Sequence, residues 1–152
     1  MTTATLTSRL FIPTDYDAAE FDPATRRLLR ATIDWFEAKG TVQIAEEVRK
    51  DEWYADFIEF LAHQRAFAIL LTPEGDSGGD PDKRWDTARN AAFNEILGFY
   101  GLPYWYAWQV TILGLGPIWQ SGNDAARRRA ACLLYTSPSP RDRTRSRMPS
   151  SA

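Results

Sequence analysis

The sequence predicts an all-α fold in a single domain, and three observations support that prediction. Apolar residues recur at helical spacing in several separate segments, whereas no segment alternates apolar and polar residues as a half-buried strand would. No internal repeat is present. A chain of 152 residues is long enough for one domain and too short for two of ordinary size. We therefore expect four or more helices packed around one core.

The N-terminal part predicts an extended arm followed by a helix. Residues 1–21 contain scattered apolar side chains without a sustained period, which is typical of an arm. A helix is expected from Asp22, which can accept hydrogen bonds from free N–H groups, and Pro23, which suits the first helical position. Gly40 is expected to end this helix. Its buried face is predicted to contain Leu28, Leu29, Thr32, Ile33 and Phe36.

The middle of the chain predicts further helices and one long loop. A second helical stretch is expected from about Thr41, with a restart near Asp51. A short apolar run over 67–71 is followed by TPEGDSGGDPDK, in which glycine and proline predict a loop. The apolar side of the restarted helix is predicted to contain Trp53, Phe57, Ile58, Phe60 and Leu61.

Three more segments follow the loop. Residues 84–100 have a helical period, and residues 104–113 are so apolar that a helix there is expected to be buried on most sides. Gly114, Gly116 and Pro117 are expected to end or kink that segment. Asn123 or Asp124 is expected to cap a last helix that stops at Ala131. The buried face of 84–100 is predicted to contain Trp85, Ala88, Ala92, Ile96 and Phe99.

Composition excludes several classes of protein. With 44% hydrophobic and 25% charged residues the chain has the values of a globular protein, not of a disordered one. No apolar run approaches the ~20 residues of a membrane span or forms a signal peptide, so we expect a cytoplasmic protein. The single Cys132 excludes a disulfide framework, and a net charge of −2 gives no reason to expect nucleic acid.

Composition changes abruptly at Cys132. Residues 132–152 contain four Arg and only one acidic residue and carry a charge of +3, against −5 for residues 1–131. CLLYTSPSPRD resembles one reading frame of a transposase adapter used for sequencing libraries, and SRMPSSA resembles the flow-cell adapter that follows it. We therefore interpret 132–152 as a non-native, disordered tail. The alternative is a genuine basic arm that contacts an acidic partner.

Motifs for catalysis are incomplete. GLGPIW begins like a dinucleotide-binding fingerprint, but Trp119 stands in place of the third glycine and no strand is predicted before it. The glycines of 75–79 lack the Gly-Lys-Ser/Thr ending of a phosphate-binding loop. His63 is the only histidine, so neither a histidine metal cage nor a convincing Ser-His-Asp set can form. We predict no catalytic residue and no metal ligand in this chain, and a solvated helix face for Arg127–Arg129.

The segment YGLPYWYAWQVTILGLGPIW concentrates Tyr and Trp around small residues. Aromatic side chains bury much surface, but the indole N–H and phenol O–H groups need partners when they are buried. Such a segment suits either a core or an apolar ligand slot with polar groups along it. Composition by itself favours the core.

Three segments carry a resemblance to one family. ILGLGPIWQSGNDAARRRAA over 112–131 resembles the end of the N-terminal helical domain of acyl-CoA dehydrogenases, where a Leu-Gly…Pro-Ile turn, a Gly-Asn/Thr-Asp/Glu step and a basic helix follow one another. LTPEGDSGG over 71–79 resembles that family's Pro-Glu…Gly-Gly loop, and RWDTARNAAFNEILGFYG resembles the next helix. Order and separations agree across 22–131. This range is therefore predicted to be such a domain, truncated before the family's β domain.

The resemblance implies a fragment of an FAD-dependent oxidoreductase. Family members oxidise the Cα–Cβ bond of an acyl-CoA with a glutamate base, pass electrons to an electron-transfer flavoprotein, and form homo-oligomers. The base and most of the flavin site are expected beyond Ala131, so this chain is expected to be inactive, with no residue assigned to FAD. Matched by position, the residues that would face the acyl chain are Trp105, Tyr106, Gln109, Val110 and Leu113.

A second hypothesis needs no missing domain. In it, the chain is a self-contained helical module that binds a partner helix or lipid through its aromatic face, and the basic tail is genuine.

Overall fold

The computed structural model describes residues 11–50, 53–73 and 75–135, with side chains up to Cys132, and these ranges contain seven α-helices and no strand. The all-α prediction is confirmed. No helix in the described ranges combines the length and the hydropathy that crossing a membrane requires. In chain order the elements are η1 (Pro13–Asp15), α1 (Pro23–Lys39), α2 (Thr41–Lys50), α3 (Ala55–His63), α4 (Ala66–Leu71), α5 (Thr87–Tyr100), α6 (Leu102–Gln120) and α7 (Asp124–Tyr135).

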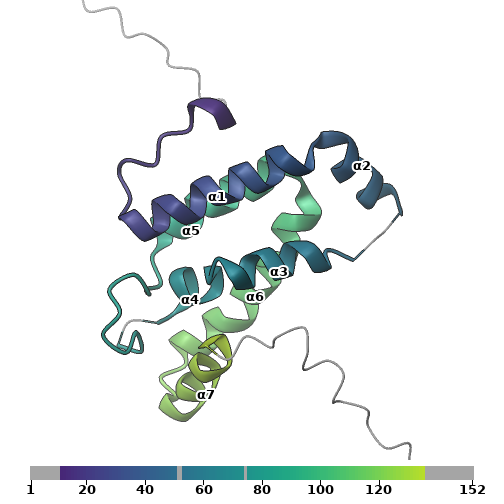
Figure 1. Cartoon of the computed structure of the whole chain (residues 1–152). Coiled ribbons are helices and arrows are strands. Elements are labelled where there is room, and N and C mark those ends of the chain that lie inside the picture. The colour runs from purple at the N-terminus through teal and green to yellow at the C-terminus, as the bar shows by residue number, and fades with distance from the viewer. Residues whose placement is uncertain (1–10, 51–52, 74, 136–152) are drawn as a thin grey trace, which may run out of the picture.

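Helix α1 lies along α5, and α6 turns away from the end of α5 to run behind α3 (Figure 1). Helix α7 packs against α4 and the far end of α6. The interior between these helices is largely apolar and contains five aromatic side chains that are fully buried, Phe36, Phe57, Phe93, Tyr104 and Trp108. The aliphatic side chains with no more than 1% exposure are Leu28, Leu29, Ile33, Leu61, Leu70, Leu71, Ile96 and Leu97.

Helix α1 forms as the sequence predicts. Asp22 Oδ1 accepts from the Thr25 N–H at 3.0 Å, and Pro23 occupies the first turn. The helix ends at Gly40, whose N–H donates to the Phe36 carbonyl at 2.9 Å. The φ of Gly40 is +77°, a conformation that glycine adopts without steric cost. All five residues predicted for its core face are buried.

The predicted arm is irregular over its described part, residues 11–21, apart from the short turn η1; residues 1–10 lie outside the described ranges. It packs on the bundle, because Ala18 is buried and the Phe11 ring lies 4.9 Å from the ring of Phe99 on α5.

The predicted start of α3 was wrong by a few residues. Helix α3 begins at Ala55 because the Ala55 N–H donates to the Trp53 carbonyl at 2.8 Å in a tight turn before the helix. Trp53 is therefore outside the helix and 67% exposed, while Phe57 and Leu61 are buried as predicted. Asp51, the expected restart, lies outside the described residues. Ile58 and Phe60 are half-buried.

The predicted face of α5 was also wrong in part. The helix begins at Thr87, after Asp86, whose carboxylate accepts from a backbone N–H at 3.0 Å. Ala88 and Phe99 are exposed, and Trp85 precedes the helix. The face that is buried contains two polar residues, which an apolar pattern could not reveal: it consists of Arg89, Asn90, Ala92, Phe93, Ile96 and Leu97.

The glycines after Leu113 do not end α6, so of the two predicted outcomes, an end or a kink, the end was wrong. Gly114 and Gly116 keep a negative φ, so neither adopts the left-handed conformation that commonly ends a helix. Pro117 lies inside the helix, which continues to Gln120. The predicted start of α7 is confirmed, because Asn123 Oδ1 accepts from the Ala126 N–H at 3.0 Å.

Helix α7 does not stop at Ala131 but continues to Tyr135, because the intervening residues are compatible with a helix. The change of composition at Cys132 is therefore not a helix end. Residues 136–152, the rest of the predicted tail, lie outside the described ranges.

A buried guanidinium joins α1 to α5. Arg89, 1% exposed, donates to Thr25 Oγ1 at 2.5 Å and to the carbonyls of Arg84 and Asp82 at 3.1 and 2.9 Å. Asp22 lies 3.5 Å from its Nε and supplies the negative charge. Burial by itself would raise the Asp22 pKa, but hydrogen bonds from Thr25 and the charges of Arg89 and Arg84 outweigh burial and lower it.

Asp22→Ala is expected to lower the free energy of unfolding by about 2–3 kcal/mol, because it removes a helix cap and leaves Arg89 without its carboxylate. Since the folded pKa of Asp22 is lowered, its contribution is present above the unfolded value of about 3.9 and is lost as pH falls through the folded pKa. Denaturant titrations at pH 7 and pH 3 measure both effects. Asp34→Ala, which removes only an exposed ion pair with Arg30, is the control, with an expected change under about 0.5 kcal/mol. Equal losses in the two variants would contradict this role for Asp22.

Candidate functional site

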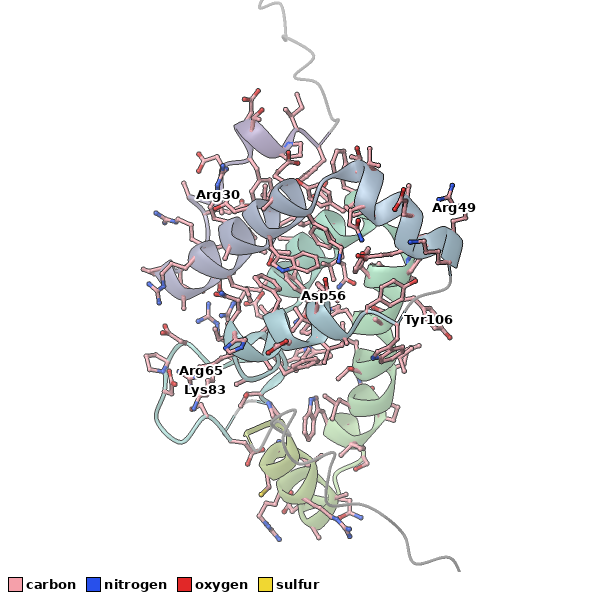
Figure 2. All side chains as sticks on the ribbon, turned by 45° about the vertical axis from the view of Figure 1, so that its right-hand side comes forward. Arg30, Arg49, Asp56, Arg65, Lys83 and Tyr106 are labelled. Atoms are coloured by element: carbon pink, nitrogen blue, oxygen red, sulfur yellow. The ribbon has the colours of Figure 1, made fainter. Side chains whose placement is uncertain are left out.

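The five residues that the resemblance assigns to an acyl-chain wall lie along one side of α6. Tyr106, Val110 and Leu113 are 62%, 48% and 63% exposed, and Trp105 and Gln109 are half-buried beside them. Leu102, 68% exposed, extends the row by one turn. We call this row of six residues the outer face of α6. In Figure 2 the Tyr106 side chain points away from the other helices.

The opposite side of α6 is core. Tyr104 and Trp108 are fully buried, and the Trp108 ring lies 5.2 Å from Phe67 and 4.8 Å from Phe93. The expectation that this helix is buried on most sides was therefore wrong: only these two α6 residues are buried, because the described helices cover one side of it. The aromatic segment is thus divided between core and surface.

The outer face is apolar and has no charge along it. The 19 residues of α6 include no Asp, Glu, Lys or Arg. An exposed row of large apolar side chains without charges is typical of a surface that another molecule or domain covers. Its polar groups are the Tyr106 hydroxyl, the Gln109 amide and the Trp105 indole N–H.

A charged cluster contacts the core side of α6 near its N-terminal end. The Lys39 ammonium on α1 lies 2.8 Å from Glu47 of α2 and also forms an ion pair with Asp56 of α3. The ammonium lies 4.8 Å from the centre of the Trp35 ring, within range of a cation–π contact. The Lys39 and Glu47 side chains are only 8% and 12% exposed, so the pair is largely screened from water. The Tyr104 hydroxyl donates to Glu47 at 2.7 Å and connects the cluster to α6.

The cluster keeps its members charged. Burial by itself would lower the Lys39 pKa, but hydrogen bonds and charges of Asp56 and Glu47 outweigh it, so the pKa is raised. Burial by itself would raise the Glu47 pKa, but hydrogen bonds from Lys39, Tyr104 and Gln43 lower it. Burial, followed by the hydrogen bond to Glu47, raises the pKa of Tyr104. The phenol therefore stays protonated and remains a donor.

Sequence reasoning missed this cluster. Lys39 and Glu47 belong to helices separated by Gly40, so no single helical period places them together. Asp56 lies on the exposed side of α3, in the first turn of that helix, and reaches Lys39 of α1 from there. The one available signal was Lys39 in the last turn of an amphipathic helix. A lysine at this position is equally typical of a side chain that complements the helix dipole.

A groove with a volume of about 860 Å³ lies between the arm and α5. It does not fit FAD, because a cofactor with a pyrophosphate needs positive charge or a row of free N–H groups. Burial, then the charges of Glu95 and Glu20, raises the pKa of Tyr16 in this groove to about 12. The groove is lined by four carboxylates and two guanidiniums, so its net charge is negative. Its ionisable residues besides Tyr16 are Glu20, Asp22, Arg84, Asp86, Arg89 and Glu95.

The second groove, of about 180 Å³, lies between α1, the α3–α4 turn and the loop. It is too small for a dinucleotide. Its charges balance, with Arg27 and Arg65 opposite Asp80 and Asp82.

The remaining sequence motifs take ordinary structural positions. GLGPIW is part of helix α6, with no turn or strand at that point. Gly75, Gly78 and Gly79 have positive φ values within the loop between α4 and α5. The His63 side chain is 75% exposed and lies 3.7 Å from Glu59. The described residues include no group of three or more His, Cys, Asp or Glu side chains arranged to hold a metal ion.

Comparison of the chain with protein-family models, curated proteins and solved structures found no match. The features of the described residues that bear on function are therefore the outer face of α6 and the charged cluster that contacts the other side of this helix.

Tyr104→Phe is expected to lower the free energy of unfolding by about 1.5–3 kcal/mol, because the phenol donates to a charged, poorly exposed carboxylate. Since the folded pKa of Tyr104 is raised, this contribution is present below the unfolded value of about 10 and is lost as pH rises through the folded pKa. Denaturant unfolding at pH 7 measures the loss. Tyr106→Phe, two residues away on the exposed side, is the control and should change stability by less than about 0.5 kcal/mol. A loss in Tyr106→Phe as large as in Tyr104→Phe would contradict the assignment.

Proposed function

We propose that the chain is the N-terminal helical domain of an FAD-dependent acyl-CoA dehydrogenase. In this proposal the outer face of α6 forms part of the wall around the acyl chain, and the domain is inactive by itself. The observation that carries the proposal is that Trp105, Tyr106, Gln109, Val110 and Leu113 form one continuous, uncharged row on the surface. An acyl chain is apolar and would be bound by such a row together with a second wall.

The chemistry is divided between this domain and the rest of the enzyme. FAD supplies the redox chemistry when it is bound, and no cluster of described residues fits it. The glutamate base, the flavin contacts and the surface for electron-transfer flavoprotein are assigned to segments beyond Ala131, as is the assembly into homo-oligomers. The role left to this domain is to orient the acyl chain and exclude water from it. The proposal includes a cytoplasmic location.

The second candidate, a self-contained module that binds a lipid or a partner helix, is favoured by the same exposed row. The two candidates differ in what covers the outer face. In the first it is an acyl chain together with other domains of the same enzyme, and in the second it is a separate molecule.

Long-read sequencing of the genomic locus tests the first candidate directly. The reading frame is expected to continue past Ala131 into a β-rich segment and then a helical bundle that carries a glutamate base. A locus that reproduces residues 132–152 followed by a stop codon would overturn the proposal and favour the self-contained module.

The purified 152-residue chain is expected to bind no stoichiometric FAD and to reduce no electron acceptor with acyl-CoA, because the residues for both lie elsewhere. Protein-bound flavin absorbs at roughly 350–500 nm, so absorbance in this range measures FAD binding. An acceptor-reduction assay with acyl-CoA measures turnover. A yellow protein that turns over acyl-CoA would show that the division of roles is wrong.

The same chain is expected to self-associate at micromolar concentration, because the outer face of α6 is uncovered. Val110→Asp/Leu113→Asp should shift it to monomer in analytical ultracentrifugation. The matched control is Val42→Asp, which introduces the same charge at a 73% exposed valine on α2 and should leave association unchanged. A wild-type chain that is monomeric, or equal effects of both changes, would contradict the role of the outer face. Binding of the wild type to phosphatidylcholine vesicles, lost in Val110→Asp/Leu113→Asp, would favour the self-contained module.

A further inference from the structure

Helix α2 is attached to the bundle by very little apolar surface. Of its ten residues only Ile44 is buried. Ile44 covers the corner between α5 and α6, where a Cβ built on Gly101 would lie 3.8 Å from an Ile44 methyl group. Val42 and Val48, the other aliphatic residues of comparable size, are 73% and 43% exposed. Burial of one isoleucine side chain is small against the conformational entropy lost when ten residues are ordered, so it cannot hold the helix in place by itself.

Polar contacts supply the rest of the attachment, and they converge on Glu47. Its carboxylate accepts from the Tyr104 hydroxyl on α6 at 2.7 Å and lies 2.8 Å from the Lys39 ammonium on α1. Glu46, on the same helix, lies 3.9 Å from Arg49 and 3.9 Å from Lys50, both residues of α2 itself. Glu47 is therefore the residue through which α2 is tied to two other helices.

We propose that α2 is a strap over the corner between α5 and α6, held closed by the negative charge of Glu47 and released when that charge is lost. Lys39 keeps its ion pair with Asp56 after Glu47 is neutralised, so α1 and α3 stay joined while α2 opens. The opening frees the Tyr104 hydroxyl at the N-terminal end of α6, while the Tyr104 ring stays packed against Phe36 and Phe57.

The groups that face Glu47 determine at which pH its charge is lost. They are Lys39 from α1, Tyr104 from α6 and Gln43 from its own helix, while Asp56 from α3 faces Lys39. The pKa of Glu47 is lowered, so the negative charge that closes the strap is present at pH values above the ordinary carboxylate pKa. The charge is lost as pH falls through the pKa of Glu47 in the folded state. Asp56, on the far side of Lys39, is 56% exposed at its side chain, so it is more accessible to water than Glu47.

Hydrogen exchange measured by mass spectrometry on the full chain tests the strap. Glu47→Gln keeps an acceptor for Tyr104 but removes the charge, and it is expected to speed exchange of the amides of 41–50 by at least about tenfold, with those of α1 and α5 unchanged. Glu46→Gln is the matched control: it makes the same chemical change one residue earlier, on an exposed side chain, and should leave exchange within about twofold. Unchanged exchange over 41–50 in Glu47→Gln would overturn the proposal.

A second measurement needs no variant. Exchange of the wild-type chain between pH 6 and pH 3, corrected for intrinsic rates, is expected to show loss of protection over 41–50 at a higher pH than over α1 and α5. Loss of protection in all segments at one pH, or equal acceleration of all segments in Glu47→Gln, would mean that α2 opens only with the whole domain and would overturn the strap.

Discussion

One buried ammonium group, on Lys39, connects three helices directly and a fourth through a single hydrogen bond. It lies at the end of α1 and forms ion pairs with Glu47 of α2 and Asp56 of α3, and Glu47 in turn accepts from Tyr104 of α6. A charge removed from water is costly unless opposite charges and hydrogen bonds replace the water. The positions of these helices relative to one another therefore depend in part on this polar cluster, which the aromatic rings of Trp35 and Tyr104 screen.

The same cluster explains why α6 has two different sides. Tyr104 and Trp108 point inward, where one reaches the Glu47 carboxylate and the other packs between Phe67 and Phe93. With the inner side held in this way, the row from Leu102 to Leu113 has to face outward. The proposed acyl-chain wall and the proposed strap meet at this place, because α2 covers the first turn of the helix that bears the outer face.

Local signals in the sequence were reliable where the physical cause was itself local. Asp22 caps α1 and Gly40 ends it, because each acts on backbone groups within four residues. Asn123 caps α7 for the same reason. Prediction failed where a distant partner decided the outcome: Arg89 and Asn90 lie on the buried face of α5 because Thr25 and the Leu70 carbonyl accept their hydrogen bonds, and nothing near them in the chain indicates this.

The sequence by itself determined the helical class, the caps and the long glycine-rich loop, because periodicity and capping are properties of neighbouring residues. Only the tertiary structure decided which side of α6 is buried, since that depends on which helices reach it. It also decided that Lys39, Glu47, Asp56 and Tyr104 meet, because ion pairs between helices are formed by packing and leave no period in the chain.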